Sequence, residues 1–374
     1  MISLVNKDCC GCTLCESVCN HHAIMMVKDS LGFMYPKIDS ALCIECGACE
    51  ALCPFTHPFV QSLDNQSAYA VRHKDLKEVQ QSRSGAAFVA MSDYILEQGG
   101  LIYGACFDKN FNIVHKCAVD RNGRDEFRGS KYAQSTFNLY RQIKSELANS
   151  YIVLFSGTPC QVAALKRYVP KSLQKNLYTI DIICHGVASP QVWNDFLTYI
   201  QEFERKKILV ANFRDKEIFG WDGLHRESFY FDDGRLRTYP YTYYQPFLLR
   251  ESCSYCPYTT LNRCSDITLG DLWGWKKIVP HFTNDNLGVS LVICNTSKGH
   301  YLFNQIQQNI NSVSVEIKEC IQPNLLRPTS EDERRKKFEL DYMAKGFRYV
   351  LKKYWVVSKK EWLKFYVKRF LGRI

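Results

Sequence analysis

The sequence predicts an α+β amino-terminal module, an α/β body with a partly parallel sheet, and a helical, basic carboxyl-terminal tail. Three observations support this. Cysteines are concentrated in the first 60 residues, strand and helix patterns alternate through the middle of the chain, and aromatic and basic residues recur at helical spacing near its end. A chain of 374 residues is too long for one ordinary domain. We expect domains at 1–60, 67–330 and 331–374, with the polar stretch 61–67 as a linker.

Composition indicates a folded cytoplasmic protein. The hydrophobic fraction is 46% and the charged fraction 23%, as in globular domains. The first eight residues do not resemble a secretory signal, and the longest apolar runs, 151–155 and 289–294, suit buried strands and not membrane spans. Because the reducing cytosol disfavours disulfides, 18 cysteines indicate metal binding or redox chemistry.

The positive charge belongs mainly to the tail. The whole chain has 48 Lys and Arg against 38 Asp and Glu, and residues 331–374 alone have 14 against 6. The rest of the chain is therefore nearly neutral, which argues against a nucleic-acid-binding body.

Two four-cysteine runs open the chain, and both have the spacing of a 4Fe-4S ligand set. They are Cys9-x2-Cys12-x2-Cys15-x3-Cys19 and Cys43-x2-Cys46-x2-Cys49-x3-Cys53. In two-cluster ferredoxins the fourth cysteine of each run binds the other cluster. We therefore expect one cluster on Cys9, Cys12, Cys15 and Cys53, and a second on Cys43, Cys46, Cys49 and Cys19.

The segment between the two runs predicts a hairpin that joins the halves of a ferredoxin-like dicluster module. Residues 24–39 form two short strand patterns around Ser30-Leu31-Gly32. The alternative is a pair of zinc sites, but zinc usually draws its cysteine pairs from separate loops. Cys10 is surplus to the motif, and we interpret it as a bystander. Asn20 stands where a proline is usual, which affects the expected loop shape and not the ligands.

Strand and helix patterns alternate through the body. We expect strands at 100–107, 113–119, 151–155 and 179–184, and helices at 137–147, 160–168 and 191–207. Two cysteines lie where such strands give way to helices. Cys160 follows Thr158 as N-cap and Pro159 as first helical residue, and Cys184 ends its strand beside His185. Ligands of open α/β sheets gather at these carboxyl ends of strands.

A third group of cysteines lies further along the chain. Cys253-x2-Cys256 supplies two ligands, and Cys160 and Cys184 can complete a four-ligand set, with Cys264 as the competing fourth ligand. The remaining four lie in strand-like or helical stretches and are interpreted as core thiols: Cys106, Cys117, Cys294 and Cys320. No GxGxxG, Walker loop or HExxH sequence is present.

Several segments together resemble the β subunits of coenzyme F420-reducing hydrogenase and dehydrogenase. They are Ser84-Gly85-Ala86-Ala87, Gly129-Ser130-Lys131-Tyr132, SGTPCQVAALKR (156–167), Cys184-His185-Gly186-Val187, Phe213-Arg214-Asp215-Lys216, and Cys253-x2-Cys256 followed by SDITLGDLWG (265–274). They cover roughly residues 67–290 in the family's order. A ferredoxin module fused to this body also occurs in the family.

The resemblance implies a flavoprotein that binds FAD and a third 4Fe-4S cluster. The matching motifs imply that the ligands of the third cluster are Cys160, Cys184, Cys253 and Cys256. They imply that the flavin contacts are Ser84, Gly85, Ser130, Lys131 and Tyr132. The two-electron carrier of well-understood members is coenzyme F420. Some relatives reduce other substrates, among them a chlorophyll derivative, and others occur among bacterial surface-polysaccharide enzymes.

The residues themselves allow plainer interpretations. A Ser-Gly-Ala turn lets the backbone approach a phosphate closely, but Ser84–Ala87 also suits an ordinary helix start. A lysine near the flavin ring stabilises the reduced flavin, but Lys131 also suits a solvated surface charge. His185 and Asp215 are candidate proton donors, because hydride chemistry at a flavin requires protons. Cys264 departs from the family's pattern and leaves the fourth ligand open.

The tail from Arg334 predicts a basic helix with aromatic residues at helical spacing: Trp362, Phe365, Tyr366, Arg369 and Phe370. One interpretation is a helix on an anionic membrane surface. The other, which we favour slightly, is a helix packed on the body with its lysines in water.

These observations predict an iron–sulfur flavoprotein oxidoreductase. Electrons from a ferredoxin or a redox partner subunit would pass through the clusters and FAD to a small-molecule acceptor, coenzyme F420 or another, or would run in reverse. Two alternatives are a non-catalytic electron-transfer subunit and an iron–sulfur accessory of a bacterial polysaccharide pathway.

Overall fold

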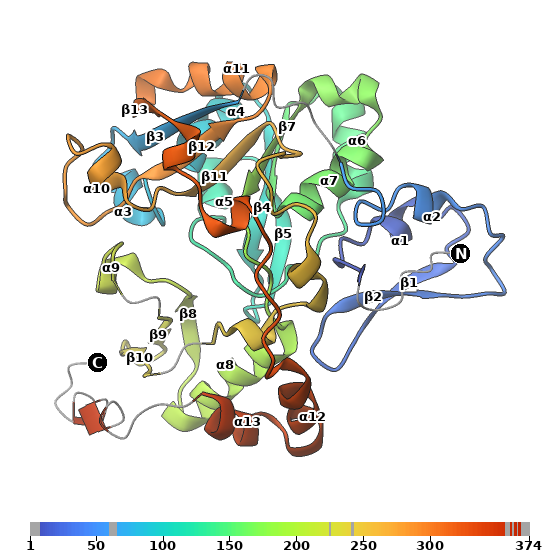
Figure 1. Ribbon diagram of the computed structural model, residues 1–374, viewed down its shortest axis with the longest axis vertical. Helices are drawn as coiled ribbons and strands as arrows, with labels where there is room; N and C mark the ends of the chain where they lie inside the picture. Colours follow the sequence, from blue (N-terminus) through green and yellow to red (C-terminus); the bar gives the residue numbers. More distant parts are fainter. Residues whose placement is uncertain are drawn as a thin grey trace.

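The computed structural model describes residues 8–59, 66–223, 226–240, 243–355 and a few positions near the carboxyl end, namely 360, 363–364 and 366–367. The amino-terminal module extends from one side of the body, next to helices α6 (Tyr140–Ala148) and α7 (Pro159–Tyr168) (Figure 1). The body contains the large sheet, and a second, smaller sheet lies beyond it.

The module is built from a hairpin and two short helices, as the cysteine runs predict. Strands β1 (Ile24–Lys28) and β2 (Met34–Ile38) pair antiparallel, with Ile24 opposite Ile38. The turn at Ser30-Leu31-Gly32 is closed by Asp29, whose carboxylate accepts hydrogen bonds from the N–H groups of Leu31 and Phe33. Helices α1 (Leu14–Val18) and α2 (Ala48–Ala51) each follow a cysteine loop.

The large sheet is mixed, and its central strands are parallel. Within the described residues the strand order is β13-β3-β12-β11-β7-β6-β4-β5, and β11, β7, β6 and β4 run parallel to one another. The expectation of a partly parallel sheet is therefore confirmed. The strands are β3 (Ser67–His73), β4 (Leu101–Phe107), β5 (Ile113–Ala118), β6 (Val153–Gly157), β7 (Leu177–Ile182), β11 (Ile267–Asp271), β12 (Ser290–Cys294) and β13 (Ile310–Val315).

Helices cover both faces of this sheet. On one face α4 (Ala87–Glu97) and α11 (Ser297–Gln305) bury apolar side chains against β4, β7 and β12. On the other face α6 and α7 pack on β4, β6 and β7, and their cluster includes cysteines of the module. Four shorter helices lie at loops: α3 (Leu76–Gln81), α5 (Arg121–Asp125), α9 (Lys216–Phe219) and α10 (Trp275–Ile278).

The predicted strands and helices of the body occur with shifts of a few residues. One shift affects the site: β7 ends at Ile182, so Cys184 lies in the loop after the strand and does not form its last residue. Helix α7, in contrast, begins at Pro159 with Thr158 as N-cap, as predicted. Because Cys184 is beyond the strand end, its position is set by loop contacts and not by the sheet register.

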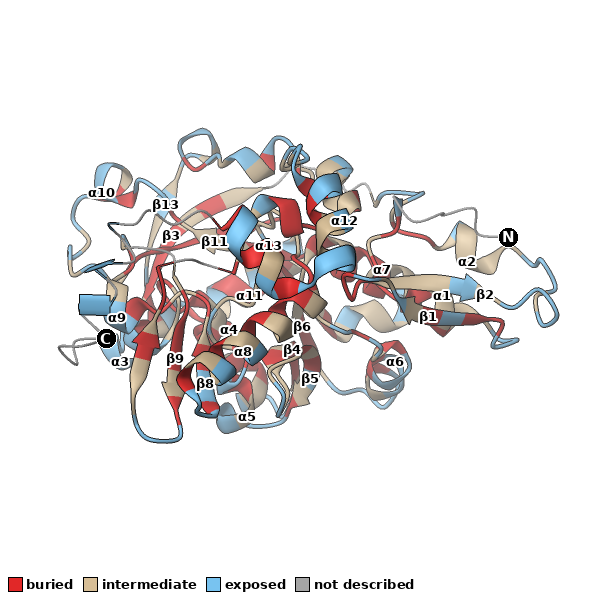
Figure 2. Cartoon of the chain, turned by 90° about the horizontal axis from the view of Figure 1, so that it is seen from below, coloured by how far each residue is buried: buried red, intermediate tan, exposed pale blue. Residues whose placement is uncertain are grey.

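A second cluster of apolar residues joins the smaller sheet to the last helices. This sheet contains β8 (Ile208–Asn212), β9 (Ser228–Phe231) and β10 (Leu236–Thr238), and it packs with α8 (Pro190–Glu204). Helices α12 (Arg335–Lys345) and α13 (Phe347–Tyr354) bury their apolar faces in the same cluster, and Figure 2 shows their buried and exposed sides.

The tail therefore packs on the body as far as Trp355, which is 6% exposed. Tyr366 is an exposed helical residue, and the other predicted tail positions, Trp362, Phe365, Arg369 and Phe370, lie outside the described residues. Within the described part of the chain, no helix combines the length and apolar character that crossing a bilayer requires.

Candidate iron–sulfur and flavin site

The first cysteine group surrounds a cavity in the half of the module that faces the body. This inner cavity has an empty volume of about 340 Å³, and its lining includes Cys9, Cys12, Cys15 and Cys53. The fourth member, Cys53, comes from the second run. The backbone N–H of Gly11 donates to the Cys9 sulfur at 3.3 Å, the kind of contact that tunes the reduction potential of a cluster.

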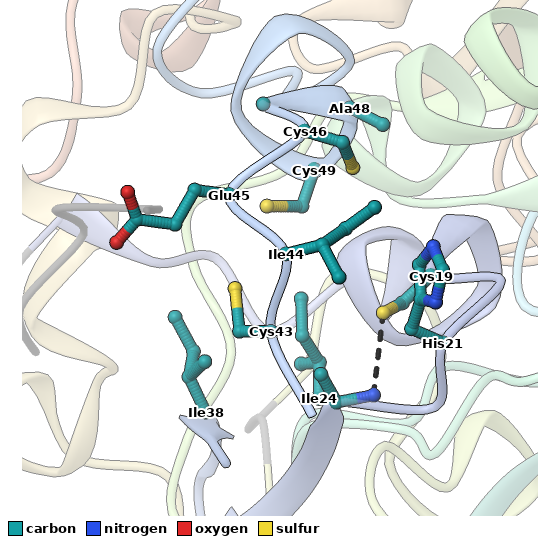
Figure 3. Close-up of a pocket in the computed structure, with 12 residues that line it drawn as sticks. Cys19, His21, Ile24, Ile38, Cys43, Ile44, Glu45, Cys46, Ala48 and Cys49 are labelled. Atoms are coloured by element: carbon teal, nitrogen blue, oxygen red, sulfur yellow. Dashed lines mark hydrogen bonds between the residues drawn. The ribbon is translucent and has the colours of Figure 1, made fainter. Parts of the chain in front are cut away.

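The second group surrounds a cavity in the outer half of the module. This outer cavity has an empty volume of about 430 Å³, and Cys19, Cys43, Cys46 and Cys49 line it (Figure 3). Ala23 N–H donates to the Cys19 sulfur at 3.3 Å. Cys46 is exposed, and Ile44 beside it is 62% exposed, so this cavity lies near solvent.

The two cysteine loops repeat the same backbone pattern. The second residue after the first cysteine has positive φ in both loops, Gly11 at 69° and Glu45 at 57°. The fourth residue after it does so as well, Thr13 at 62° and Gly47 at 73°. Non-glycine residues rarely adopt this conformation, so its recurrence shows that both loops are shaped for the same task.

Burial makes free thiolates costly at these positions. It raises the pKa of Cys15 to about 12, and in the body it raises that of Cys256 to about 12. A buried thiolate therefore requires a nearby positive centre, which an iron cluster supplies. Among the described residues no three Cys, His, Asp or Glu side chains converge closely enough for a single metal ion. The chemistry of the donor set, four cysteines around each cavity, fits a cubane.

A third cysteine group lies where β6 and β7 end. The thiol of Cys184 interacts electrostatically with Cys253, Cys160 and Cys256, and Gly186 N–H donates to its sulfur at 3.4 Å. Cys160 lies in the first turn of α7, where the hydroxyl of Thr158 is 3.2 Å from its sulfur. The structure therefore brings together the four cysteines that the resemblance implied.

Cys264 lies beside this group but is engaged elsewhere. It is 0% exposed, and its thiol donates to the carbonyl of Pro159 at 3.2 Å. Its sulfur also lies 4.0 Å from Asp181, which pairs with Arg263 at 3.0 Å. These contacts are those of a core thiol that supports α7. Of the other predicted core thiols, Cys106, Cys294 and Cys320 are buried and Cys117 is half-buried.

Cys10 occupies the space between two groups. The neighbouring thiol of Cys12, together with burial, raises the pKa of the Cys10 thiol well above its ordinary value, and Cys160 acts in the opposite direction. Cys10 and Cys160 also pack in one apolar cluster with Cys12 and Cys256. The inner cavity of the module and the body group therefore meet at this residue.

The predicted flavin and proton-transfer residues divide into two places. Tyr132 stacks on His185 at 5.6 Å between ring centroids, and Tyr244 Oη lies 2.5 Å from His185 Nδ1. Burial, aided by the charge of Arg214, lowers the pKa of His185 to about 4. Asp215 instead caps α9: its carboxylate accepts from the N–H groups of Glu217 and Ile218 and from Ser228 Oγ.

The segment Ser84–Ala87 leads into α4, with Ala86 as its N-cap. A Cβ at Gly85 would lie 2.0 Å from the carbonyl oxygen of Val71 and 2.7 Å from the amide nitrogen of Ser290. The glycine is therefore required where β3 and β12 pack, which is a different reason from the phosphate contact that we expected. The hydroxyl of Ser84 is buried and has no hydrogen-bond partner.

Lys131 is folded back on its own chain. Its ammonium donates to the carbonyls of Glu126 at 3.0 Å and Arg128 at 2.6 Å, and burial lowers its pKa to about 8. Ser130, the other predicted contact in this loop, is half-buried. Lys131 is thus neither a free surface charge nor, in this structure, directed at Tyr132.

Sequence reasoning missed a cluster of cations between these places. Arg214 donates to Tyr132 Oη at 3.3 Å and pairs with Asp271 at 3.0 Å. Lys216 donates to the carbonyls of Val79, Ser84 and Leu287. Arg214 and Lys216 belong to the quoted segment 213–216, so the motif contained the signal even though these residues were not singled out.

Arg83 is the third cation of this cluster, and its Nε is buried without a partner. Burial and the charge of Arg214 lower its pKa to about 10. In the sequence Arg83 is a single arginine in a polar stretch just before the Ser-Gly-Ala segment. Only its position in the fold therefore indicates a role.

Comparison with known proteins bears on both parts of the chain. The family model for the C terminus of the coenzyme F420 hydrogenase/dehydrogenase beta subunit matches residues 152–319. The 4Fe-4S dicluster domain model matches residues 8–56. No curated protein matches the sequence.

Among solved structures, a chain of the F420-reducing NiFe hydrogenase complex from Methanosarcina barkeri, studied by xenon derivatization, is similar. It is 15% identical with a TM-score of 0.44, and the alignment covers 74% of this chain and 92% of that one. The chain thus matches the C-terminal part of the coenzyme F420 hydrogenase/dehydrogenase beta subunit over residues 152–319, and a 4Fe-4S dicluster domain over residues 8–56.

Proposed function

We propose that this protein is an iron–sulfur flavoprotein oxidoreductase in which a dicluster domain (1–60) exchanges electrons with a flavin-binding body (67–330). The inner cluster would be held by Cys9, Cys12, Cys15 and Cys53, and the outer one by Cys43, Cys46, Cys49 and Cys19. The body cluster would be held by Cys160, Cys184, Cys253 and Cys256. The segment 331–374 would form a basic helical tail.

The observation that carries this proposal is the sequence of cysteine groups in space. The outer group lies near solvent, the inner group faces the body, and the body group lies at the carboxyl ends of β6 and β7. Redox centres exchange electrons by tunnelling, which requires short separations. An ordered series from the surface to the sheet edge therefore suits a relay between an external donor and a buried site.

Buried polar atoms near Ser84 support an anionic cofactor such as FAD. The Ser84 hydroxyl and Arg83 Nε have no hydrogen-bond partners, and helix α4 begins at Ala87, three residues after Ser84, so the backbone N–H groups of its first turn follow directly. We infer that these groups, with Gly85, would hold the phosphates, and that Tyr132 and His185 would lie near the redox ring with Ser130 and Lys131 at its margin. A bound flavin would couple one-electron and two-electron transfer.

The residues of this chain would orient the ring and move protons. Tyr244 and Tyr132 fix the plane of His185, so its second nitrogen, Nε2, has a defined direction. Asp215 caps α9 and thereby fixes the positions of Lys216 and Arg214. We therefore infer that Asp215 positions these two residues and does not donate a proton directly. The acceptor would be coenzyme F420 or another two-electron carrier, and the donor a ferredoxin or a redox partner subunit.

Iron and flavin content test the proposal directly. Protein purified without oxygen is expected to contain about 12 iron atoms from three four-iron clusters and one FAD per chain. The Cys184→Ala variant should lose about four of these iron atoms. Cys294→Ala, which alters a buried cysteine in β12 away from the three groups, should lose none.

Each other outcome has a definite meaning. Zinc in place of iron would reject the relay, and about eight iron atoms without flavin would leave a dicluster domain on a body with no redox role. If iron and FAD are present but the reduced protein turns over no carrier without a partner subunit, the chain is an electron-transfer subunit and not an enzyme by itself.

A further inference from the structure

A buried arginine connects the body to the amino-terminal module. The main chain of Arg250 lies beside the body group: its N–H donates to the Val187 carbonyl at 2.8 Å, and its carbonyl accepts from the Cys253 N–H at 3.0 Å. Its side chain reaches the inner group, where Nε donates to the Cys9 carbonyl at 2.6 Å. The guanidinium also lies against Gly11, because a Cβ on Gly11 would be 2.9 Å from Nη1. Arg250 therefore lies between the two proposed cluster sites.

The other contacts of this guanidinium are with neutral groups. Nη1 donates to Gln134 Oε1 at 2.8 Å, and Nη2 donates to the Met34 carbonyl at 2.9 Å. The central carbon of the guanidinium lies 4.1 Å from the centroid of the Tyr35 ring. In the part of the chain that the structure describes, no carboxylate lies within ion-pair distance of Arg250. Its positive charge is thus hydrogen-bonded but not neutralised.

Two other arginines are buried as deeply, and each of them has an acidic partner. Arg250 is 1% exposed, Arg124 is 1% exposed and pairs with Asp93 at 2.8 Å, and Arg263 is 2% exposed and pairs with Asp181 at 3.0 Å. A buried charge without a counter-charge is strongly unfavourable, and an arginine does not escape this cost by losing its proton. Arg250 therefore requires a negative group that is not a carboxylate of the described residues.

An iron–sulfur cluster is such a group. A cubane held by four thiolates is anionic, and reduction adds one further negative charge to it. The net charge at a cluster and the charges around it set its reduction potential. Because Coulomb attraction grows with the charge of the cluster, a nearby guanidinium stabilises the reduced state more than the oxidised state.

We propose that Arg250 is the shared counter-charge of the inner and body clusters, and that its fixed positive charge raises the reduction potentials of both. This inference rests on the proposed function, because it requires clusters in both places. It goes further by giving the relay a direction: electrons that enter at the outer cluster near solvent are drawn toward the body.

The electron steps balance without any change in bonding. One electron leaves the outer cluster, which is oxidised by one unit, and enters the inner cluster, which is reduced by one unit. The same exchange then takes place between the inner and body clusters. No covalent bond forms or breaks, and Arg250 keeps its protons throughout. The first electron comes from a low-potential one-electron donor, for which dithionite serves as the probe.

The test separates the charge of Arg250 from its hydrogen bonds in the full, iron-loaded chain without oxygen. Arg250→Gln removes the charge but keeps an amide donor, whereas Arg250→Lys keeps the charge but loses the planar fork of donors. Gln134→Ala is the matched control, because it removes a hydrogen-bond partner of Arg250 and leaves the charge in place. Iron content and the midpoint potentials, from a dithionite titration followed by EPR, are measured for each.

We expect the iron content of all three variants to equal that of wild type. In Arg250→Gln the inner and body clusters should become harder to reduce by about tenfold in equilibrium constant, which is about 59 mV for a one-electron couple. The outer cluster of the same molecules should keep its potential and is the internal reference. Arg250→Lys and Gln134→Ala should titrate close to wild type, whereas a merely structural role would make all three variants behave alike.

Other results would overturn the proposal or the function on which it rests. Unchanged potentials in Arg250→Gln would overturn the proposal, and so would an equal fall in Arg250→Lys or in Gln134→Ala. If Arg250→Gln does not retain its iron, Arg250→Lys carries the test: wild-type potentials support the counter-charge, and lowered potentials overturn it. If the wild-type chain itself lacks the inner or the body cluster, the proposed function fails instead.

Discussion

Gly11 and Gly47 both hold left-handed backbone in the cysteine loops, but their surroundings differ. A Cβ at Gly11 would lie 2.6 Å from Gln134 Nε2 and 2.9 Å from Arg250 Nη1, while a Cβ at Gly47 would meet nothing within 4 Å. An L-residue in this conformation costs about 1–2 kcal/mol. Gly47→Ala should therefore cost about that amount, and Gly11→Ala should cost clearly more, because it also displaces the side chains that hold the module.

Thermal unfolding of the two iron-loaded variants without oxygen measures this difference. The melting temperature of Gly11→Ala should fall well below that of Gly47→Ala. At the position equivalent to Gly47 the other loop has Thr13, with a φ of 62°. This conformation therefore accommodates a side chain, in keeping with the smaller effect expected for Gly47→Ala. Equal shifts in the two glycine variants would contradict the close packing of Gly11 against the body.

At this scale the sequence predicted which cysteines gather, but not what surrounds them. Spacing alone indicated that Cys53 joins Cys9 and that Cys19 joins Cys43, because a compact loop can deliver three ligands and the fourth must come from elsewhere. The place of Cys10 could not be predicted, since Cys160 reaches it only through the docking of two distant segments. The cation cluster of Arg83, Arg214 and Lys216 depends on tertiary structure for the same reason.

Helix α12 shows how much a single helix contributes to the stability of the body. Phe338 on α12 is 0% exposed and packs on Phe247 at 4.9 Å between ring centroids, while Leu340 on the same helix is 70% exposed. Replacing a buried phenylalanine by alanine costs about 3–5 kcal/mol, whereas an exposed leucine contributes little. Phe338→Ala should therefore strongly destabilise the protein, and Leu340→Ala should not.

Chemical unfolding of the two variants, followed by tryptophan fluorescence, gives the comparison. If Phe338→Ala proves no less stable than Leu340→Ala, α12 is not part of the body's core. Liposome flotation of the full chain and of a chain that ends at Trp355, which keeps α12 and α13, then tests the membrane interpretation of the tail. Equal flotation would eliminate it.

Elements were predictable where hydrophobic periodicity was strong. Strands β4 and β5 and helix α7 begin and end within a residue or two of expectation, because their apolar positions follow one clear period. The continuous helix expected from Arg334 is instead interrupted at Gly346, whose φ of 74° ends α12 before α13 begins. Cys184 was expected as the last residue of its strand because the apolar run of β7 continues past its last paired residue.

In the whole molecule the outer cysteine group lies near solvent and the inner group lies against the body, and this arrangement has a consequence for docking. Cys46 in the outer loop is exposed, whereas Cys12 in the inner loop is buried in the apolar cluster that contains α6 and α7. An external electron carrier can therefore approach the outer group most closely. The sequence predicted a module and a body, but their relative orientation depends on contacts such as Arg250 with the Cys9 carbonyl, which no local pattern encodes.

Stability of the whole fold should also depend on pH through a buried histidine of the large sheet. His115 on β5 is 6% exposed and lies between the rings of Phe137 and Phe155, and burial lowers its pKa from the ordinary 6.5 to about 4. Between these values the unfolded chain binds a proton that the native protein does not. The free energy of unfolding should therefore fall as the pH falls from 6.5 to 4, by about 3 kcal/mol from this residue.

His115→Gln removes the titration and keeps an amide that can donate to the Ser156 carbonyl, which His115 Nε2 contacts at 3.2 Å. Denaturant unfolding at several pH values in this window should give a flatter pH dependence for this variant than for wild type. His281→Gln, at an exposed position, should follow wild type. The carboxylates titrate alike in all three proteins, so the difference in slope isolates His115. Parallel curves would mean that the native protein can protonate this histidine without opening its contacts with Phe137 and Phe155.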